Sequence, residues 1–324
     1  MKVKVTTSGR LHLGFMDLNG DLGRLYGSIG VSLKAPQTQL TIEDHKNLSI
    51  SGNDDHLKNR ISSFTKAFSS RFKIKPKVRI ELTRHIPEHK GLGSGSQLGL
   101  ALITGLSKIC NISKSLYELA AVADRGLRSG IGITSFEKGG FIIDGGKKRI
   151  SDKKISAEPP KALLRYNFPL SWHFVLVIPE KKVGLSGKQE KEAMGYLSPS
   201  RKISEEICRM VMMQLLPSLI EEDIEKFGKA VSEIDIKTGT FFKPVQGGIY
   251  SEKSSYDIIR QMIESGAAGA GQSSWGPAVY GLAHKNDVPQ LAEEMKDFMK
   301  RKKINGDVIT TQARNRGAKV DIIP

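Results

Sequence analysis

The sequence is poor in cysteine, in aromatic residues and in long apolar runs. Cys110 and Cys208 are the only cysteines among 324 residues, and no Cys or His spacing is typical of a zinc site. The longest apolar stretches, such as 174–178, are far shorter than a membrane span, and the first residues alternate like a strand instead of resembling a secretory signal. We therefore expect a cytoplasmic protein with two buried free thiols and no membrane segment.

Basic residues outnumber acidic ones, 50 to 34, which gives a formal net charge of +16. Such a balance suits nucleic acid, an anionic surface or phosphorylated small molecules. The basic residues are dispersed in short runs such as 147–149 and 301–303, and aromatic residues make up only 6% of the chain. No RNA-recognition motif is present. A basic RNA-binding protein therefore stays as the weakest alternative, and nucleic acid is not the expected partner.

Apolar periodicity predicts an α+β protein in two halves. In the first half we expect strands and turns up to about residue 52, followed by elements in the order helix 54–72, strand 78–82, helices 97–109 and 114–125, strands 130–133 and 139–143. A polar, proline-containing stretch, 147–171, is expected to connect the halves. The predicted second half contains a strand 173–178, a polar loop 184–195, helices 200–216, 220–234 and 255–264, a glycine loop 266–276, a strand 278–283, a helix 288–301 and a strand 308–311.

The strongest local signal is the run His89–Gln97, which precedes an apolar helix. Glycines at 91, 93 and 95 let successive backbone amides point at one spot, and the helix start adds unpaired donors and a positive dipole end. Together these features favour an anion site suited to phosphate. The run is not a Walker loop and it lacks the third glycine of a dinucleotide fingerprint. An ordinary glycine-rich connection is the alternative.

Two further segments interrupt apolar patterns with polar or small residues. In the segment 9–20, Arg10 and His12 share one strand face, where they could hold a phosphate or carboxylate, or belong to a solvated edge. In the segment 266–277, small residues allow close approach of a ligand or another backbone. Trp275 in that loop is either a stacking surface for a planar ligand or a core residue.

Taken in order, these three segments resemble the three motifs of the GHMP kinases, and the resemblance covers essentially the whole chain. It implies an α+β fold with a ribosomal-protein-like α/β N-terminal domain, residues 1–165, and a ferredoxin-like C-terminal domain, residues 166–324. One departure concerns the chemistry. Gly132 stands where these kinases commonly carry an aspartate that assists the substrate hydroxyl. Because glycine can neither accept a proton nor orient a hydroxyl, an ATP-dependent small-molecule kinase stays only as the alternative.

The departures themselves resemble the β-ribofuranosylaminobenzene 5′-phosphate synthases of methanopterin biosynthesis. The matching segments are 10–14, 89–97, 126–132, 136–141, 144–146 and 271–277. The resemblance implies a pentosyltransferase, a glycosyltransferase of archaeal type. It would join phosphoribosyl pyrophosphate to 4-aminobenzoate or 4-hydroxybenzoate and release CO2 and pyrophosphate. It also implies Mg²⁺ bound with the pyrophosphate, no requirement for ATP, and a homodimer as a candidate assembly.

The resemblance also assigns roles to residues. We expect catalytic groups at Arg10, His12, Asp17 and Arg128, and acceptor-binding groups at Arg24, Arg125 and Trp275. No metal ligands are singled out. The glycine loop 266–276 is expected to pack beside the central loop, so that both line one cleft between the halves. The expected ligands of the donor phosphates are Lys90, Gly91, Gly93, Ser94, Gly95, Ser96, Gln97, Gln272, Ser273 and Ser274.

Overall fold

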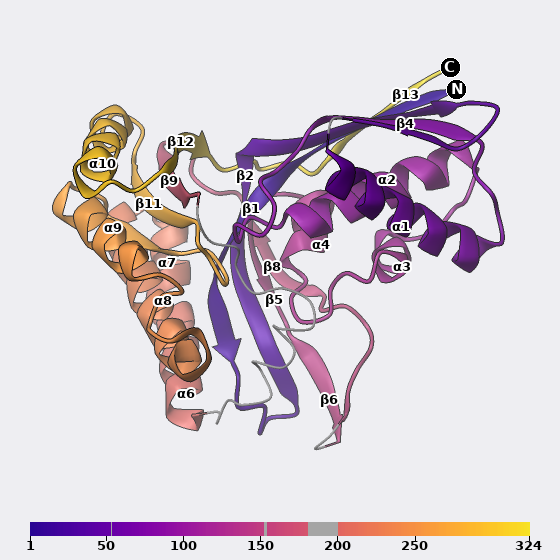
Figure 1. Cartoon of the computed structure of the whole chain (residues 1–324). Helices are drawn as coiled ribbons and strands as arrows, with labels where there is room; N and C mark the ends of the chain where they lie inside the picture. The colour runs from indigo at the N-terminus through magenta and orange to yellow at the C-terminus, as the bar shows by residue number, and fades with distance from the viewer. Residues whose placement is uncertain (53, 152–153, 181–199) are drawn as a thin grey trace.

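A long antiparallel hairpin runs through the middle of the computed structural model, which describes residues 1–52, 54–151, 154–180 and 200–324 (Figure 1). Its strands are β1 (Lys2–Asp17) and β2 (Arg24–Asp44). Helices α1–α4 lie on one side of the hairpin and α6–α10 on the other (Figure 1). The expected polar loop 184–195 lies outside the described residues. The two halves predicted from the sequence therefore share this hairpin as a central wall.

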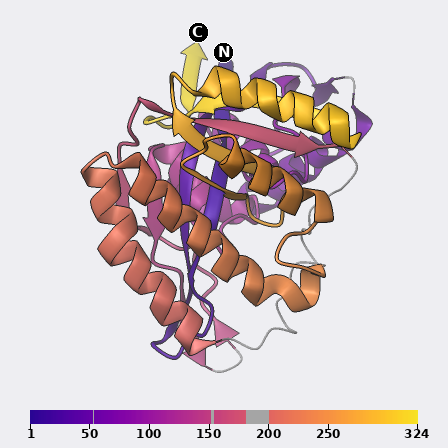
Figure 2. The ribbon, with the colours of Figure 1, turned by 90° about the vertical axis from the view of Figure 1, so that its left-hand side faces the viewer.

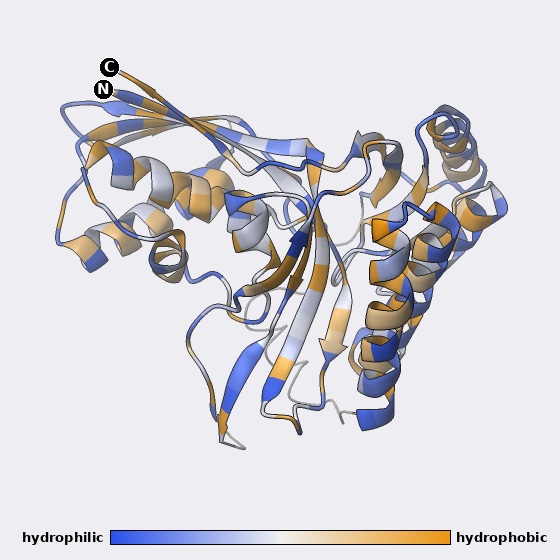
Figure 3. Ribbon diagram, turned by 180° about the vertical axis from the view of Figure 1, so that it is seen from behind, coloured by the Kyte–Doolittle hydropathy of each residue, from blue (hydrophilic) through white to orange (hydrophobic). Residues whose placement is uncertain are grey.

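The described strands form a nine-stranded and a four-stranded sheet, and the hairpin belongs to the larger one. Its β1 pairs with β2 with bulges between Ser8 and Arg10 and between His12 and Gly14. The strand β6 beside the far end of the hairpin is largely hydrophilic (Figure 3). The other strands of this sheet are β3 (Ser49–Ser51), β4 (Val78–Arg84), β5 (Phe141–Asp144), β6 (Lys147–Ser151), β7 (Lys154–Ile155), β8 (Ala162–Tyr166) and β13 (Lys319–Ile323).

Helices of the first half pack on this sheet through apolar faces. The helix α1 (Asp55–Phe72) begins where the Asp54 carboxylate accepts a hydrogen bond from the Leu57 amide at 3.1 Å. Its buried residues recur at helical spacing, as the sequence predicted. The helix α2 (Ser94–Ile109) is buried along most of its length. Two short helices, α3 (Leu116–Val122) and α4 (Ile131–Glu137), complete this layer.

The second half places helices against the other face of the hairpin and against the small sheet (Figure 2). That sheet has the order β10-β11-β9-β12. One apolar core joins Leu11, Leu13 and Ile29 of the hairpin to Phe174 and Phe227, so the halves are not packed independently. The elements are β9 (Trp172–Pro179), α6 (Arg201–Met210), the π-helical turn η1 (Val211–Leu215), α7 (Leu216–Ile220), α8 (Ile224–Gln246), α9 (Lys253–Glu264), β10 (Gly269–Gln272), β11 (Val279–His284), α10 (Val288–Lys302) and β12 (Gly306–Gln312).

The last strand crosses the predicted domain division. β13 pairs antiparallel with β1, with Lys2 opposite Ile323, so the two termini lie side by side (Figure 1). A strand from the end of the chain thus completes the sheet of the first half. The boundary at 165/166 stays a prediction, and the pairing shows that a simple cut there would remove one strand from the larger sheet.

Four sequence expectations were wrong. The two cysteines are not both buried, since Cys208 is exposed and Cys110 is half-buried. The predicted strand 130–133 is instead the start of helix α4, whose Ile131, Ile133 and Phe136 are buried. A four-residue apolar run cannot distinguish a strand from a helix by its period. The predicted connection 147–171 contains β6, β7 and β8, and the predicted loop 266–276 contains β10. In β10 a β-carbon at Gly269 would lie 2.2 Å from the Gly228 carbonyl oxygen, so glycine there allows α8 to pack directly on the strand.

Candidate active site

The start of α2 forms a turn that only glycine adopts without strain. Gly91 and Gly93 have φ values of 78° and 81°, in the left-handed region. Gly93 is the N-cap, and its carbonyl oxygen accepts hydrogen bonds from the amides of Ser96 and Gln97, each at 3.1 Å. A helix start presents unpaired amides and a partial positive charge. The predicted anion-binding geometry is therefore present at Ser94 and Gly95.

Three arginines from separate elements converge on this turn. A β-carbon at Gly93 would lie 3.3 Å from Cγ of Arg10, and one at Gly95 would lie 2.6 Å from a terminal nitrogen of Arg60 and 3.5 Å from one of Arg125. Burial, and then the charge of Arg125, lowers the pKa of Arg60; burial likewise lowers the pKa of Arg125. Both guanidiniums are thus partly desolvated and repel each other. We call Arg10, Arg60, Arg125 and the α2 start the arginine cradle.

Arg60 was not among the residues predicted from the sequence. It lies on α1 and pairs with Glu88, while the Arg125 guanidinium lies 5.3 Å from the centre of the Phe64 ring. These contacts fix both arginines beside the loop. No local pattern marks Arg60, since it occupies a partly exposed position of an ordinary amphipathic helix. Only the packing of α1 on α2 brings it to the loop.

Two predicted donor ligands are engaged with the protein itself. Lys90 Nζ donates to the carbonyl oxygens of Pro179 at 2.7 Å and Glu180 at 2.8 Å. The fully buried Gln97 side chain accepts from Thr7 Oγ1 and donates to the Gly132 carbonyl oxygen at 2.9 Å. Both side chains hold the loop in place. Their predicted contact with the donor stays a prediction that would require these bonds to break.

Gly132 lies next to the loop. A β-carbon there would be 3.2 Å from Cβ and 3.4 Å from Oγ of Ser96. The segment is held by the buried Asp144, whose carboxylate accepts from the amide of Gly130 at 2.7 Å and from that of Ser28 at 3.1 Å. Burial raises the pKa of Asp144, and these hydrogen bonds oppose the rise. The site where a kinase aspartate is expected therefore faces the α2 start without a carboxylate.

The C-terminal glycine loop packs beside the central loop, as expected from the sequence. That both loops line one cleft stays a prediction. Ser273 Oγ donates to the Gly91 carbonyl oxygen at 2.8 Å, across 182 residues of sequence, and accepts from the His12 amide at 3.0 Å. The Ser274 amide donates to the His12 carbonyl oxygen at 3.2 Å. A β-carbon at Gly91 would lie 2.2 Å from the Ser273 carbonyl oxygen, so glycine is required for this approach. Strand β1 is thereby clamped between the two loops.

The polar side chains of the C-terminal loop form its internal structure. Gln272 Oε1 accepts from the amide and hydroxyl of Ser251, each at 3.0 Å, and Gln272 Nε2 donates to the Ser274 carbonyl oxygen at 3.0 Å. Ser273 is fully buried. The roles predicted for Gln272 and Ser273 as ligands of donor phosphates stay predictions. In this structure both side chains are hydrogen-bonded to protein groups.

A narrow pocket is lined by residues of β1, α8 and the C-terminal loop, and we call it the α8 pocket. Trp275 lines it, is 7% exposed and packs on Phe242 with ring centres 4.6 Å apart. His12 also lines it, and burial, then the charge of Arg10, lowers the pKa of His12 to about 3, so the imidazole is neutral. The lining residues are His12, Gly14, Phe15, Asp235, Thr238, Gly239, Phe242, Gln246, Ile249, Tyr250, Gln272, Ser274 and Trp275.

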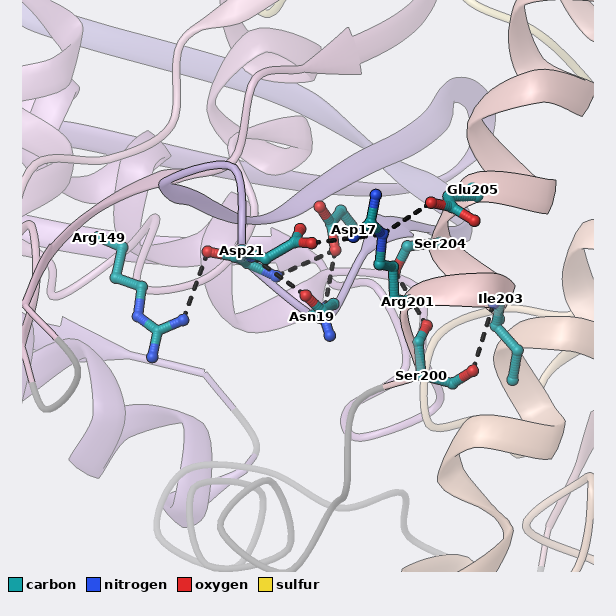
Figure 4. A network of polar contacts seen from close by, with 10 residues as sticks. Asp17, Asn19, Asp21, Arg149, Ser200, Arg201, Ile203, Ser204 and Glu205 are labelled. Atoms are coloured by element: carbon teal, nitrogen blue, oxygen red, sulfur yellow. Dashed lines mark hydrogen bonds and ion pairs between the residues drawn. The ribbon is translucent and has the colours of Figure 1, made fainter.

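Two predicted site residues lie at the far tip of the hairpin. Asp17 Oδ1 accepts from the amides of Asn19 at 2.7 Å and Gly20 at 3.1 Å, beside Arg201 of α6 (Figure 4). Arg24 donates to the carbonyl oxygens of Gly145 at 2.5 Å and Gly146 at 3.0 Å. Asp17 lies seven positions after Arg10 along the extended strand, a distance of about 23 Å. The structure therefore does not bring Asp17 and Arg24 to the cradle.

Arg128 lies close enough to Lys147 to act on its charge. It precedes the segment held by Asp144, and burial, followed by the charge of Arg128, lowers the pKa of Lys147.

Among the residues that the structure describes, no group of three or more His, Cys, Asp or Glu side chains could hold a metal ion. In the same part of the chain, no helix is long and apolar enough to cross a membrane.

Comparison with known proteins agrees with this geometry. Residues 59–140 match the N-terminal domain model of the GHMP kinases and residues 215–301 match their C-terminal model. A β-ribofuranosylphenol 5′-phosphate synthase of Methanothermobacter thermautotrophicus is 33% identical over 97% of each chain. Proteins of the same name from Methanocaldococcus jannaschii and Archaeoglobus fulgidus are 30% and 29% identical over nearly the full length of each chain. The chain belongs to the β-ribofuranosylphenol 5′-phosphate synthase family.

Solved structures place this synthase family in the GHMP kinase fold. A homoserine kinase from Cytophaga hutchinsonii superposes with a TM-score of 0.69 at 17% identity, covering 99% of this chain and 97% of the kinase. A mevalonate pyrophosphate decarboxylase from Streptococcus pyogenes gives 0.64 at 18% identity and 97% coverage of both. At such identities the likeness shows the fold alone, and it confirms the predicted fold class.

Proposed function

We propose that this chain transfers the phosphoribosyl group of phosphoribosyl pyrophosphate to the ring carbon of an aromatic acid, with release of CO2 and pyrophosphate. The observation that carries the proposal is the arginine cradle at the α2 start, facing Gly132 instead of an aspartate, in a member of the β-ribofuranosylphenol 5′-phosphate synthase family. The cradle offers positive charge for a departing anion, and Gly132 offers no base for a kinase reaction.

The donor would lie with its pyrophosphate at the α2 start. Helix amides and three guanidiniums stabilise the charge that grows on pyrophosphate as its bond to ribose C1 breaks. The Mg²⁺ that pyrophosphate carries in solution would enter as part of this substrate and would add charge neutralisation. Arg10 would contact both substrates, because it bonds to the central loop and lies two residues before His12 on the same strand.

We propose 4-hydroxybenzoate as the acceptor. The name of the relatives describes a ribofuranosyl phenol, which retains a hydroxyl, whereas 4-aminobenzoate would give an aminobenzene. The acceptor carboxylate, which leaves as CO2, would face Arg10. The hairpin-tip residues Asp17 and Arg24, together with Arg128, stay candidates for contacts to the substrates.

The cellular setting is part of the same proposal. A ribofuranosylphenol phosphate suits the methanopterin pathway that the family resemblance implied, carried out in the cytoplasm. A homodimer stays a candidate assembly, to be tested by the mass of the protein in solution. A kinase reaction is the second candidate, since homoserine kinase shares the fold.

One assay separates the two candidates. Incubate the protein with phosphoribosyl pyrophosphate, Mg²⁺ and carboxyl-labelled 4-hydroxybenzoate or 4-aminobenzoate, without ATP. We expect pyrophosphate and labelled CO2 in equal amounts, with the hydroxy acid preferred. Strict dependence on ATP, with formation of ADP, would make the kinase candidate correct and our proposal wrong.

A further inference from the structure

The α8 pocket contains buried polar atoms that the protein does not satisfy. Asp235 of α8 is 6% exposed, and its Oδ1 accepts from the Gln272 amide at 3.1 Å. The Tyr250 hydroxyl on the pocket wall also acts on this carboxylate, but Oδ2 itself has no hydrogen-bond partner among the described residues. The same holds for Nε2 of His12, which is 4% exposed, and for Oγ1 of Thr238. The hydroxyl of the fully buried Tyr280, close to Asp235, also has no partner in the described chain.

Burying these polar atoms lowers the stability of the fold unless a ligand or a water forms hydrogen bonds with them. Each buried polar group without a partner costs on the order of 1–3 kcal/mol. Native proteins leave few such groups, and a bound water, an ion, a ligand or a catalytic role can account for each. The interior of the pocket encloses about 30 Å³, which is room for water or for the polar end of a small molecule.

The walls of the same pocket are aromatic. Phe15, Phe242 and Trp275 line it, with Phe15 and Phe242 ring centres 6.0 Å apart in an edge-on arrangement. Aromatic side chains favour a flat ring at their edges or faces. A site with aromatic walls and an unsatisfied carboxylate oxygen fits a ring that carries one hydrogen-bond donor, which describes a phenol.

We propose that Asp235 accepts a hydrogen bond from the 4-hydroxyl group of the acceptor, which inserts into the α8 pocket while the ring rests at its aromatic mouth. This inference rests on the proposed function and names the residue that recognises the acceptor. Asp235 would then be a catalytic residue, since it touches the reacting molecule.

The position of the pocket relative to the cradle suits the reaction. Arg10 and His12 lie two residues apart on β1, opposite Ser32 and Gly30 of β2, which places them about 6.6 Å apart on one face of the strand. The Ser273 hydroxyl links His12 to Gly91 between the two sites. A para-substituted ring can therefore hold its hydroxyl near Asp235 and direct its opposite carbon toward the cradle.

The hydrogen bond would activate the carbon that reacts. A carboxylate that accepts the phenolic proton raises the electron density at the para carbon. That carbon forms a bond to ribose C1 as the bond from C1 to the pyrophosphate oxygen breaks, and the electron pair leaves with pyrophosphate. The bond to the carboxylate carbon then breaks, its electron pair restores the ring, and CO2 departs. The phenolic proton remains shared with Asp235 and stays on the product.

The test compares Asp235→Asn with a matched variant, Glu225→Gln, which makes the same chemical change on the exposed first turn of α8. Dissociation constants are measured at pH 8, where Asp235 is charged, for 4-hydroxybenzoate, for benzoate, which lacks the hydroxyl, and for phosphoribosyl pyrophosphate. We expect the wild type and Glu225→Gln to prefer 4-hydroxybenzoate by at least about tenfold, as for a hydrogen bond to a charged group. In Asp235→Asn this preference should largely vanish, with benzoate and donor binding unchanged.

Two outcomes would overturn the inference: Asp235→Asn keeps the full preference, or it loses both acids equally. If Asp235→Asn does not fold, the wild type decides through 4-methoxybenzoate. A narrow pocket with an acceptor atom should reject this bulkier compound, which has no donor, and equal binding of all three acids would refute the idea. A wild type that prefers 4-hydroxybenzoate but releases no CO2 or pyrophosphate would refute the proposed function alone.

Discussion

Two glycine loops of similar composition have different structures around them. The central loop places Gly93 and Gly95 beside Arg10, Arg60 and Arg125, at a helix start whose amides point outward. In the C-terminal loop, Gln272 and Ser273 are hydrogen-bonded to Ser251, His12 and Gly91. Both loops contain residues with positive φ and both resemble binding loops in sequence. The two loops differ in the partners of their polar groups and not in glycine content. The central loop has the geometry of an anion-binding site, whereas the C-terminal loop stabilises the fold.

The glycines of the two loops also serve different purposes. Gly91 is needed because Ser273 approaches its α-carbon, so this glycine belongs to the clamp between the loops. Gly93 has a positive φ, and the space where its β-carbon would lie is bordered by Arg10. Substitutions can therefore separate the clamp from the cradle, with effects that should range from complete loss of donor binding to a small shift in pH dependence.

The largest effect is expected for Gly93→Val. A β-branched residue at φ 81° costs on the order of 1–3 kcal/mol, and its side chain would displace Arg10 from the cradle. We expect donor binding to fall below detection in isothermal titration with phosphoribosyl pyrophosphate. Gly247→Val is the control, since Gly247 has φ 80° and no atom lies within 4 Å of the position that its β-carbon would take. Equal loss of donor binding in both variants would contradict a specific role for Gly93.

Removing one cation should weaken donor binding by a smaller amount. Arg60→Gln and Arg125→Gln each delete a charge beside Gly95, and a hydrogen bond to a charged group contributes about 1.5–3 kcal/mol. We expect the dissociation constant of phosphoribosyl pyrophosphate to rise roughly 10- to 150-fold. Arg71→Gln makes the same change in the last turn of α1, about 16 Å along the helix from Arg60, and should leave it unchanged. If Arg71→Gln weakens donor binding as much as either cradle variant, the loss is not specific to the cradle.

The two loops also show which features of the site could be predicted from the sequence. The motif 89–97 predicted the anion site and the helix that follows it, because the glycine spacing and the helix start are local features. The pairing of the two loops was predicted because each loop alone has too few side chains to recognise a ligand, and it is confirmed by the bond from Ser273 to Gly91. The family and the fold class are confirmed as well.

What the sequence could not provide depends on packing between distant elements. Arg60 reaches the loop only because α1 packs on α2, and Asp235 faces a pocket only because α8 packs on β1 and β10. Alternation placed Arg10 and His12 on one face, but no local rule showed that a hairpin of this length carries Asp17 far from the cradle. The helix at 131–137 was missed for a related reason, since its short apolar run fits either period.

Paired serine variants should separate the loops at a finer level. Ser94→Ala removes a hydroxyl at the α2 start, and we expect the dissociation constant of the donor to rise about tenfold, with thermal stability unchanged. Ser273→Ala removes a hydroxyl that is hydrogen-bonded to His12 and Gly91, leaving a buried amide unsatisfied. That variant should lose on the order of 1–3 kcal/mol of stability in urea unfolding. The reverse assignment of effects would mean that the C-terminal loop is the phosphate site.

The smallest effect concerns pH, and it arises because the loops differ in the groups beside them. The cradle is built from arginines, which stay charged at all ordinary pH values. The C-terminal loop adjoins Asp235, whose pKa burial raises to about 7 from 3.8, against the opposing influence of the Gln272 amide and the Tyr250 hydroxyl. It also adjoins His12, whose pKa is lowered to about 3 from 6.5. Without ligand, these two groups make opposite contributions to the pH dependence of stability.

The signs follow from proton binding in the folded and unfolded states. Asp235 has a raised pKa, so its contribution to stability is present below 3.8 and is lost as pH rises toward 7. His12 has a lowered pKa, so its contribution is present above 6.5 and is lost as pH falls toward 3. Between about pH 4 and 6.5 the two slopes oppose each other. The free energy of unfolding of Asp235→Asn should therefore rise more steeply with pH than that of the wild type. For His12→Gln, the slope of this free energy against pH should be lower than for the wild type. Parallel curves for all three proteins in urea unfolding across this range would show that neither group is buried in the unliganded protein.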